Sequence, residues 1–299
     1  MGNGSAAATD IIALPKGGGA QRGIGETFAP DLQTGTGNFT VPLALPPGRN
    51  GFQPELKLAY STGNGNGPFG LGWALSIPGV SRKTARGVPR YRDRPNTPAE
   101  WDTFILSGAE DLVPISDDGG TYFRPRTEGL FARIERNQDY GGDWWEVRSK
   151  DGLLSRYGTR LEADPGHPWR DPAALADPAD PARVFAWKLE HTEDPFGNAI
   201  VYDYVTDVDP SPQPRWIQTY LQRIRYIEVD SGANSNFLVS VSFDYEPRPD
   251  IASDHRAGFA IRTGLRCAAI TVRTHAGQAR TVRSYRLSYE QAPLNGGCR

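Results

Sequence analysis

The chain has 299 residues, of which 38% are hydrophobic and 23% are charged, and its formal net charge is −2. These values are ordinary for a soluble globular protein with one large domain or two modest ones. The near-neutral charge gives no reason to expect nucleic acid as a partner, and no apolar run reaches the about 20 residues of a membrane helix, so direct membrane insertion is not expected.

Residues 1–13 are small and polar enough to form a mobile tail, and they lack the features of a classical secretory signal. Residues 14–91 are rich in glycine and proline, with short alternating runs such as 38–45 and 56–60 between them. A period of two predicts half-buried strands, and the glycine and proline clusters predict the turns between them. The glycines expected to shape these turns, several with positive φ, are Gly35, Gly37, Gly65, Gly67, Gly70 and Gly72.

The alternation continues toward residue 162, so 14–162 is expected to form a first β region. A hairpin is predicted over 104–124, and strands are predicted over 130–134 and 144–149. Asp151 and Gly152 then form a strong turn signal before the run 153–158, since glycine readily takes the positive φ that such a turn needs.

Residues 163–182 interrupt this rhythm with repeated Asp-Pro pairs and many alanines. They are expected to form a surface excursion or an internal linker, and 172–176 are compatible with a short helix. A second β region is predicted over 183–299, with Gly197 and Asn198 in a turn at 194–198. The fold class expected is therefore all-β, with many short antiparallel strands.

Residues 65–70 match the pattern G-x-G-x-x-G, but Pro78 and Gly79 would break the helix that a dinucleotide site requires. We therefore predict a turn there, and no cofactor site.

The histidines have no metal-ligand spacing and are expected to be structural or superficial; they are His167, His191, His255 and His275. The charged cluster around His191, with Glu190, Glu193 and Asp194, is interpreted as a solvated loop. Cys267 and Cys298 do not indicate a disulfide framework, and Cys267 is expected to be buried. The sequence thus predicts no catalytic and no metal site.

Many segments, in order, resemble the amino-terminal domain of the SpvB family. They include LPKGGGA (14–20), RGIGETF (22–28), the long run 34–73, 81–91, FILSGAEDLVPI (104–115), 191–204, 243–250, 258–267 and 284–290. That domain is shared by a Salmonella virulence protein and by the B components of Tc-type insecticidal toxin complexes. The stretch 194–204 also resembles a single YD/RHS repeat.

The resemblance implies a non-enzymatic structural segment of a secreted bacterial toxin or virulence protein. Its strands would form part of a large curved sheet, a shell closed together with RHS components, which encloses a toxic effector until a pore-forming toxin subunit releases it. Export is expected by a non-classical route, with a cytoplasmic pool in the producing bacterium. The outermost strands of such a segment would pair with strands of other segments, so the chain alone is expected to associate.

Two alternatives stay open. The first is an export or translocation domain whose ADP-ribosyltransferase domain lies outside this chain. Here Ser61, Thr62 and Gly63 stand where such enzymes have S-T-S, and no Glu-x-Glu pair occurs. The second is an independent cell-surface domain that binds carbohydrate through exposed aromatic side chains; the candidates are Trp144, Trp145, Trp169 and Trp216.

Overall fold

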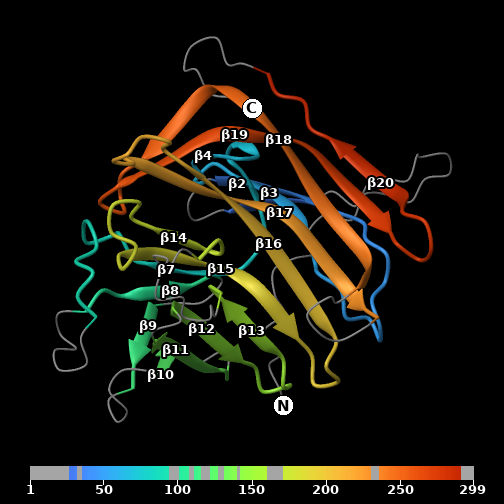
Figure 1. The fold of residues 1–299 in the computed structure, drawn as a ribbon, viewed down its shortest axis with the longest axis horizontal. Coiled ribbons are helices and arrows are strands. Elements are labelled where there is room, and N and C mark those ends of the chain that lie inside the picture. Colours follow the sequence, from blue (N-terminus) through green and yellow to red (C-terminus); the bar gives the residue numbers. More distant parts are fainter. Residues whose placement is uncertain are drawn as a thin grey trace. The chain divides into compact units, whose positions relative to one another are not determined.

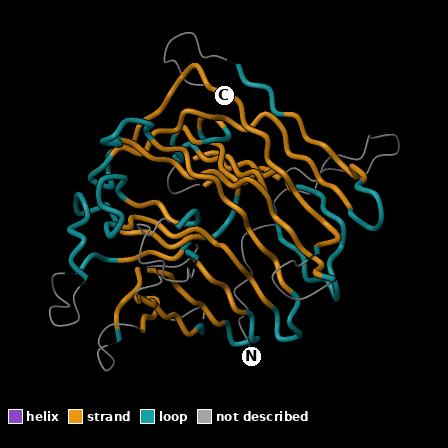
Figure 2. The backbone as a smooth tube through the Cα atoms, in the orientation of Figure 1, coloured by secondary structure: helices purple, strands orange, loops and turns teal. Residues whose placement is uncertain are grey.

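The computed structural model describes residues 27–31, 36–93, 101–107, 111–115, 122–126, 131–139, 142–159, 171–229 and 236–290 (Figure 1). These residues form strands, turns and loops, and none of them is helical (Figure 2). The all-β prediction is therefore confirmed. The described residues accordingly contain no helix that could cross a membrane. The described residues divide into two compact units, one within 1–45, 55–76 and 289–299 and the other within 46–54 and 77–288.

The first unit is a small antiparallel sheet. Its four strands lie in the order β1 (Thr27–Asp31), β2 (Thr36–Pro42), β3 (Lys57–Ser61) and β6 (Trp73–Leu75). The short strands β4 (Asn66–Gly67) and β5 (Gly70–Leu71) form a separate hairpin. Phe39, Tyr60 and Trp73 lie opposite one another on β2, β3 and β6. The Trp73 ring contacts those of Phe39 and Tyr60, at centroid distances of 6.0 and 5.4 Å, as expected for cross-strand aromatic packing.

The second unit contains a closed ring of eight antiparallel strands. They are β7 (Gly79–Arg82), β8 (Phe104–Leu106), β9 (Asp111–Pro114), β10 (Tyr122–Pro125), β11 (Arg133–Asp139), β12 (Gly142–Arg148), β13 (Leu154–Tyr157) and β15 (Val184–Glu193). The last of these, β15, closes the ring because it pairs with both ends of the series. Its residue Trp187 lies opposite Val80 of β7, and Leu189 lies opposite Tyr157 of β13.

Beyond the ring the sheet continues from the C-terminal end of β15, where residues 191–193 pair with β16, through long strands (Figure 1). They are β16 (Ala199–Val208), β17 (Trp216–Glu228), β18 (Phe237–Asp254), β19 (Ala260–Thr274) and β20 (Arg280–Arg286). One face of this extension buries apolar residues such as Tyr226, Val241 and Val272. The alternate positions are mostly polar, as a sheet with one buried face requires.

The described part of the expected excursion, 171–182, differs from the prediction. It contains β14 (Ala174–Ala176), which pairs with β15, and the proposed short helix over 172–176 is absent there. Ala173, Ala174 and Leu175 are at most 4% exposed. The N-terminal part of β15 supplies the backbone partners: the Lys188 amide, for example, donates to the Ala173 carbonyl oxygen at 2.7 Å. The small alanine side chains let this strand pack closely, and only the Asp-Pro steps on either side behave as turns.

Candidate functional site

Two arginines lie at buried positions of the ring, on strand faces that are otherwise apolar. Arg82 of β7 follows Val80, and Arg136 of β11 follows Ile134, with the spacing of two that keeps side chains on one face of a strand. Arg82 is 3% exposed and Arg136 is 5% exposed. Because an unpaired buried charge costs several kcal/mol, each needs carboxylate partners within the ring.

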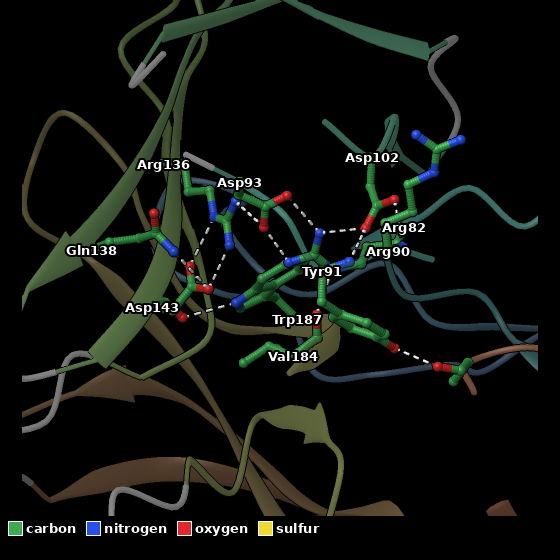
Figure 3. A network of polar contacts seen from close by, with 11 residues as sticks. Arg82, Arg90, Tyr91, Asp93, Asp102, Arg136, Gln138, Asp143, Val184 and Trp187 are labelled. Atoms are coloured by element: carbon green, nitrogen blue, oxygen red, sulfur yellow. Dashed lines mark hydrogen bonds and ion pairs between the residues drawn. The ribbon is translucent and has the colours of Figure 1, made fainter. Parts of the chain in front are cut away.

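Three aspartates supply these partners (Figure 3). Asp93 lies between the arginines: Nη1 of Arg82 donates to its Oδ1 at 2.8 Å, and Nη1 of Arg136 donates to its Oδ2 at 2.9 Å. Asp102 accepts a second bond from Arg82, 2.9 Å long. Asp143 of β12 accepts from Nε and Nη2 of Arg136, at 2.9 and 2.6 Å. The network therefore joins Asp93, which follows β7 in the chain, and Asp102, which precedes β8, to the strands β7, β11 and β12 of the ring.

Aromatic rings pack around the two guanidinium groups. The Arg82 guanidinium carbon lies 5.0 Å from the centre of the Phe104 ring, and that of Arg136 lies 4.9 Å from the same ring. Both also face Trp187, at 5.7 and 5.1 Å, and Trp187 Nε1 donates to the Asp143 backbone oxygen at 2.8 Å. Such cation–π contacts add most where water is excluded.

The pKa values follow from these contacts. Burial alone raises the pKa of Asp93, but the hydrogen bonds and charges of Arg82 and Arg136 more than offset it, and the pKa lies below its ordinary value. Burial lowers the pKa of Arg136, but Asp143 and Asp93 raise it overall. These contacts thus favour the charged forms of Asp93 and Arg136, as in a structural connection between strands.

The turn residues singled out from the sequence are dispersed. Gly35 lies outside the described residues. Gly37 lies in β2 and Gly67 in β4, and neither these two nor Gly65, just before β4, has positive φ. Among the described turn residues that the sequence singled out, four have positive φ, between 79° and 94°: Gly70, Gly72, Gly152 and Gly197. The amide nitrogens of Asn198 and Phe196 both donate to the Asp194 side chain at 2.9 Å, which orders the turn at 194–198.

Two of these glycines are required by their surroundings. A Cβ on Gly72 would lie 2.5 Å from Cε2 of Tyr60, and a Cβ on Gly152 would lie 2.9 Å from Cγ of Pro195. The second contact also places the turn after β12 beside the turn after β15. The G-x-G-x-x-G match at 65–70 falls on the hairpin of β4 and β5, with no helix following it in 71–93, as predicted.

The cluster around His191 is not a loop, contrary to the expectation. Glu190, His191 and Glu193 lie in β15, and only Asp194 begins the turn. Glu190 occupies a β-bulge, because Leu189 pairs with Tyr157 and His191 with the preceding Arg156. Burial raises the pKa of Glu190 to about 7, and burial followed by the charge of Arg156 lowers the pKa of His191. The alternation of apolar and polar residues continues along β15 up to the turn at 194–198, and this signal could have assigned these residues to a strand.

The remaining candidates lie apart. His255 is exposed in a turn, His275 Nε2 lies 2.8 Å from Ser240 Oγ, and His167 and Cys298 fall outside the described residues. Cys267 is fully buried, as predicted, and burial raises the pKa of its thiol to about 12. Within the described segments, no three His, Cys, Asp or Glu side chains are grouped so that they could hold a metal ion.

The tryptophans proposed to bind carbohydrate do not form a common exposed surface among the described residues. Trp144 and Trp145 are 5% and 0% exposed, because β12 lies in the ring with both of these residues covered, so the carbohydrate-binding alternative loses two of its candidates. Trp216 packs under the Arg262 guanidinium, whose carbon lies 4.9 Å from the ring centre. Trp169 lies outside the described residues.

Comparison with known proteins gives consistent matches. The family model described as "SpvB: Salmonella virulence plasmid 65kDa B protein" matches residues 31–275. The Mono(ADP-ribosyl)transferase SpvB of Salmonella typhimurium is 29% identical over 276 residues, covering 79% of this chain and 42% of that protein. The chain therefore spans less than half the length of this curated relative.

Solved structures share the fold. A crystal structure of TcdB2-TccC3 matches with a TM-score of 0.76 and 25% identity, over 96% of this chain and 16% of that chain. The Photorhabdus luminescens Tc holotoxin pore matches with a TM-score of 0.75 and 25% identity, over 95% and 15%. The N-terminal domain of the effector protein SpvB from Salmonella typhimurium strain LT2 matches with a TM-score of 0.70 and 24% identity, over 87% and 96%.

The fold is thus that of a β-sheet domain found in bacterial toxin and virulence proteins. The chain belongs to the SpvB family, and it is related to components of Tc toxins.

Proposed function

We propose that this chain is a non-enzymatic structural segment of a secreted toxin or virulence protein, whose sheet continues into neighbouring segments to form a shell around an effector. The observation that carries the proposal is the edge strand β20. Among the described strands it pairs with β19 alone, and all its residues except Tyr285 are exposed. A strand with an unpaired edge and side chains open on both faces is suited to recruit another strand.

The comparisons support the same proposal. In TcdB2-TccC3 the matching region is 16% of a chain that is much longer than this one, so a fold of this kind is there one part of a larger body. The partners proposed are accordingly RHS components, a pore-forming toxin subunit and an enclosed effector. Secretion by a non-classical route belongs to the same proposal.

A specific observation favours a second candidate. The curated relatives are named as mono(ADP-ribosyl)transferases, and this chain covers 42% of their length. An export domain that accompanies a transferase located elsewhere would give the same match. In both cases this chain itself would lack transferase activity, in keeping with the missing Glu-x-Glu pair.

The experiment that tests the proposal is co-expression of this chain with the RHS segments of a Tc toxin, followed by co-purification. The proposal expects a stable complex that is reduced by Val282→Lys, a charged substitution on β20, where Val282 is 52% exposed. Failure of the unaltered chain to join any complex would contradict it. Co-purification that Val282→Lys leaves intact would show that β20 is not the contact.

A further inference from the structure

The polar face of the long strands contains a groove of about 560 Å³ over β17, β18 and β19. Its floor is formed by the small side chains Ser240 and Ser242 of the central strand β18. Ser240 lies opposite Arg225 of β17 on one side and Arg273 of β19 on the other. Because neighbouring strands are about 4.8 Å apart, the two arginines border a trough about 10 Å wide.

The groove has an excess of positive charge. Arg223, Arg225 and Arg273 line it, and none of the described lining residues is acidic. Asp203 of β16 accepts from Nε of Arg223 at 3.1 Å and from Nε and Nη2 of Arg225 at 2.9 and 2.8 Å. Arg273, in contrast, forms no ion pair within the described part of the chain. Two of the three guanidinium groups therefore share one carboxylate and the third has none, although the whole chain carries a net charge of −2.

Neighbouring contacts hold this groove in shape. His275 Nε2 and Ser240 Oγ are 2.8 Å apart, which fixes the floor, and Ser240 is 6% exposed. The Arg225 guanidinium carbon lies 4.9 Å from the centre of the Phe237 ring, which orients that arginine. Phe237, Leu238 and Val229 also give one wall of the groove an apolar character.

From this geometry we propose that the groove binds an acidic peptide segment, with a carboxylate held between Arg225 and Arg273 over Ser240 and an apolar side chain against Phe237 and Leu238. Guanidinium groups bind carboxylates through paired, charge-assisted hydrogen bonds. A groove of this size suits a short peptide better than a single small ion. The site is separate from the edge of β20, so it does not depend on the proposed shell.

The test is a titration of the whole chain with a short fluorescent peptide that alternates glutamate and leucine. The matched peptide replaces glutamate by glutamine, and inorganic phosphate is titrated separately at the same ionic strength. The key variant is Arg273→Gln, because Arg273 has no ion pair in the described residues whose loss would disturb the fold. The control variant is Arg124→Gln, which removes the same charge from an exposed position on β10.

We expect saturable binding of the glutamate peptide only, with an affinity that Arg273→Gln lowers about tenfold or more and Arg124→Gln leaves unchanged. Equal melting temperatures of the variants would exclude unfolding as the cause. The proposal is overturned if the glutamate peptide does not bind, if the glutamine peptide binds equally, or if Arg273→Gln has no effect. Saturation by phosphate without peptide binding would also overturn it, in favour of a small-anion site.

Discussion

Replacement of Asp93 by asparagine should destabilise the ring, because Asp93 is the carboxylate that both buried arginines share. Asp93 accepts one hydrogen bond from Arg136 and two from Arg82. An amide keeps the shape but loses the charge, and its NH2 group cannot accept, so it loses either the one bond at Oδ1 or the two bonds at Oδ2. Hydrogen bonds to charged groups contribute about 1.5–3 kcal/mol each.

The expected cost is at the low end of the sum for two lost bonds, about 3 kcal/mol, since each arginine keeps another aspartate. That is a large share of the about 5–15 kcal/mol that stabilises a typical domain. Urea unfolding of Asp93→Asn should measure the loss. The matched control is Asp254→Asn, because Asp254 pairs with Arg256 at the surface, with side chains 37% and 74% exposed. An exposed pair contributes about 0–1 kcal/mol.

The pH dependence gives the same prediction a second measurement. Because the folded-state pKa of Asp93 lies below its unfolded value of about 4, its stabilisation is complete above that pH and is lost as the pH falls through the folded-state value. Asp93→Asn should therefore lose less stability than the parent protein on acidification below about pH 4. If Asp93→Asn and Asp254→Asn cost the same, the buried network does not stabilise the ring and the reasoning is refuted.

Three other predictions follow from particular residues. Because burial raises the folded-state pKa of Glu190 to about 7, its ionisation costs the folded protein stability as the pH rises from about 4 to 7. Glu190→Gln should therefore stabilise the protein at pH 8 by up to about 3 kcal/mol and have little effect at pH 4, as measured by thermal melting at both pH values. Gly72→Ala should cost about 1 kcal/mol or more in urea, whereas Gly65→Ala, with open space at its Cβ, should be near neutral; equal costs would contradict the role of backbone geometry. Incubation of the chain with NAD and actin should give no labelled actin, and labelling that requires the chain would show that it is an enzyme.

The strands could be predicted from the sequence because alternation and turn residues are local signals. The run 144–149 and the turn at Gly152 correspond closely to β12 and its connection to β13. The closure of the ring could not be predicted, because it depends on β15 pairing with two strands that are far away in the chain. β14 was missed because its alanines and the adjacent prolines lack β propensity, and tertiary pairing with β15 decides its conformation.

The charged sites were less accessible to sequence reasoning than the fold. Arg82 and Arg136 stand at core positions of their strands, and a charged residue at an apolar position of the alternation is a signal that could have revealed them. Their partner Asp93 lies in a loop, and nothing local connects it with either arginine. The net charge of −2 likewise gives no indication of the basic groove, because it sums the charges of the whole chain. Arg223, Arg225 and Arg273 come together only through the register of the strands.

The open edge of β20 can be tested most directly by size-exclusion chromatography with light scattering over a range of chain concentrations. If β20 recruits other strands, the mass should rise above that of a monomer with concentration, and Val282→Lys should reduce the association. Val88→Lys is the control, since Val88 is similarly exposed, at 57%, but lies in a loop. A concentration-independent monomer with a cooperative melt would contradict the account and indicate a self-contained domain.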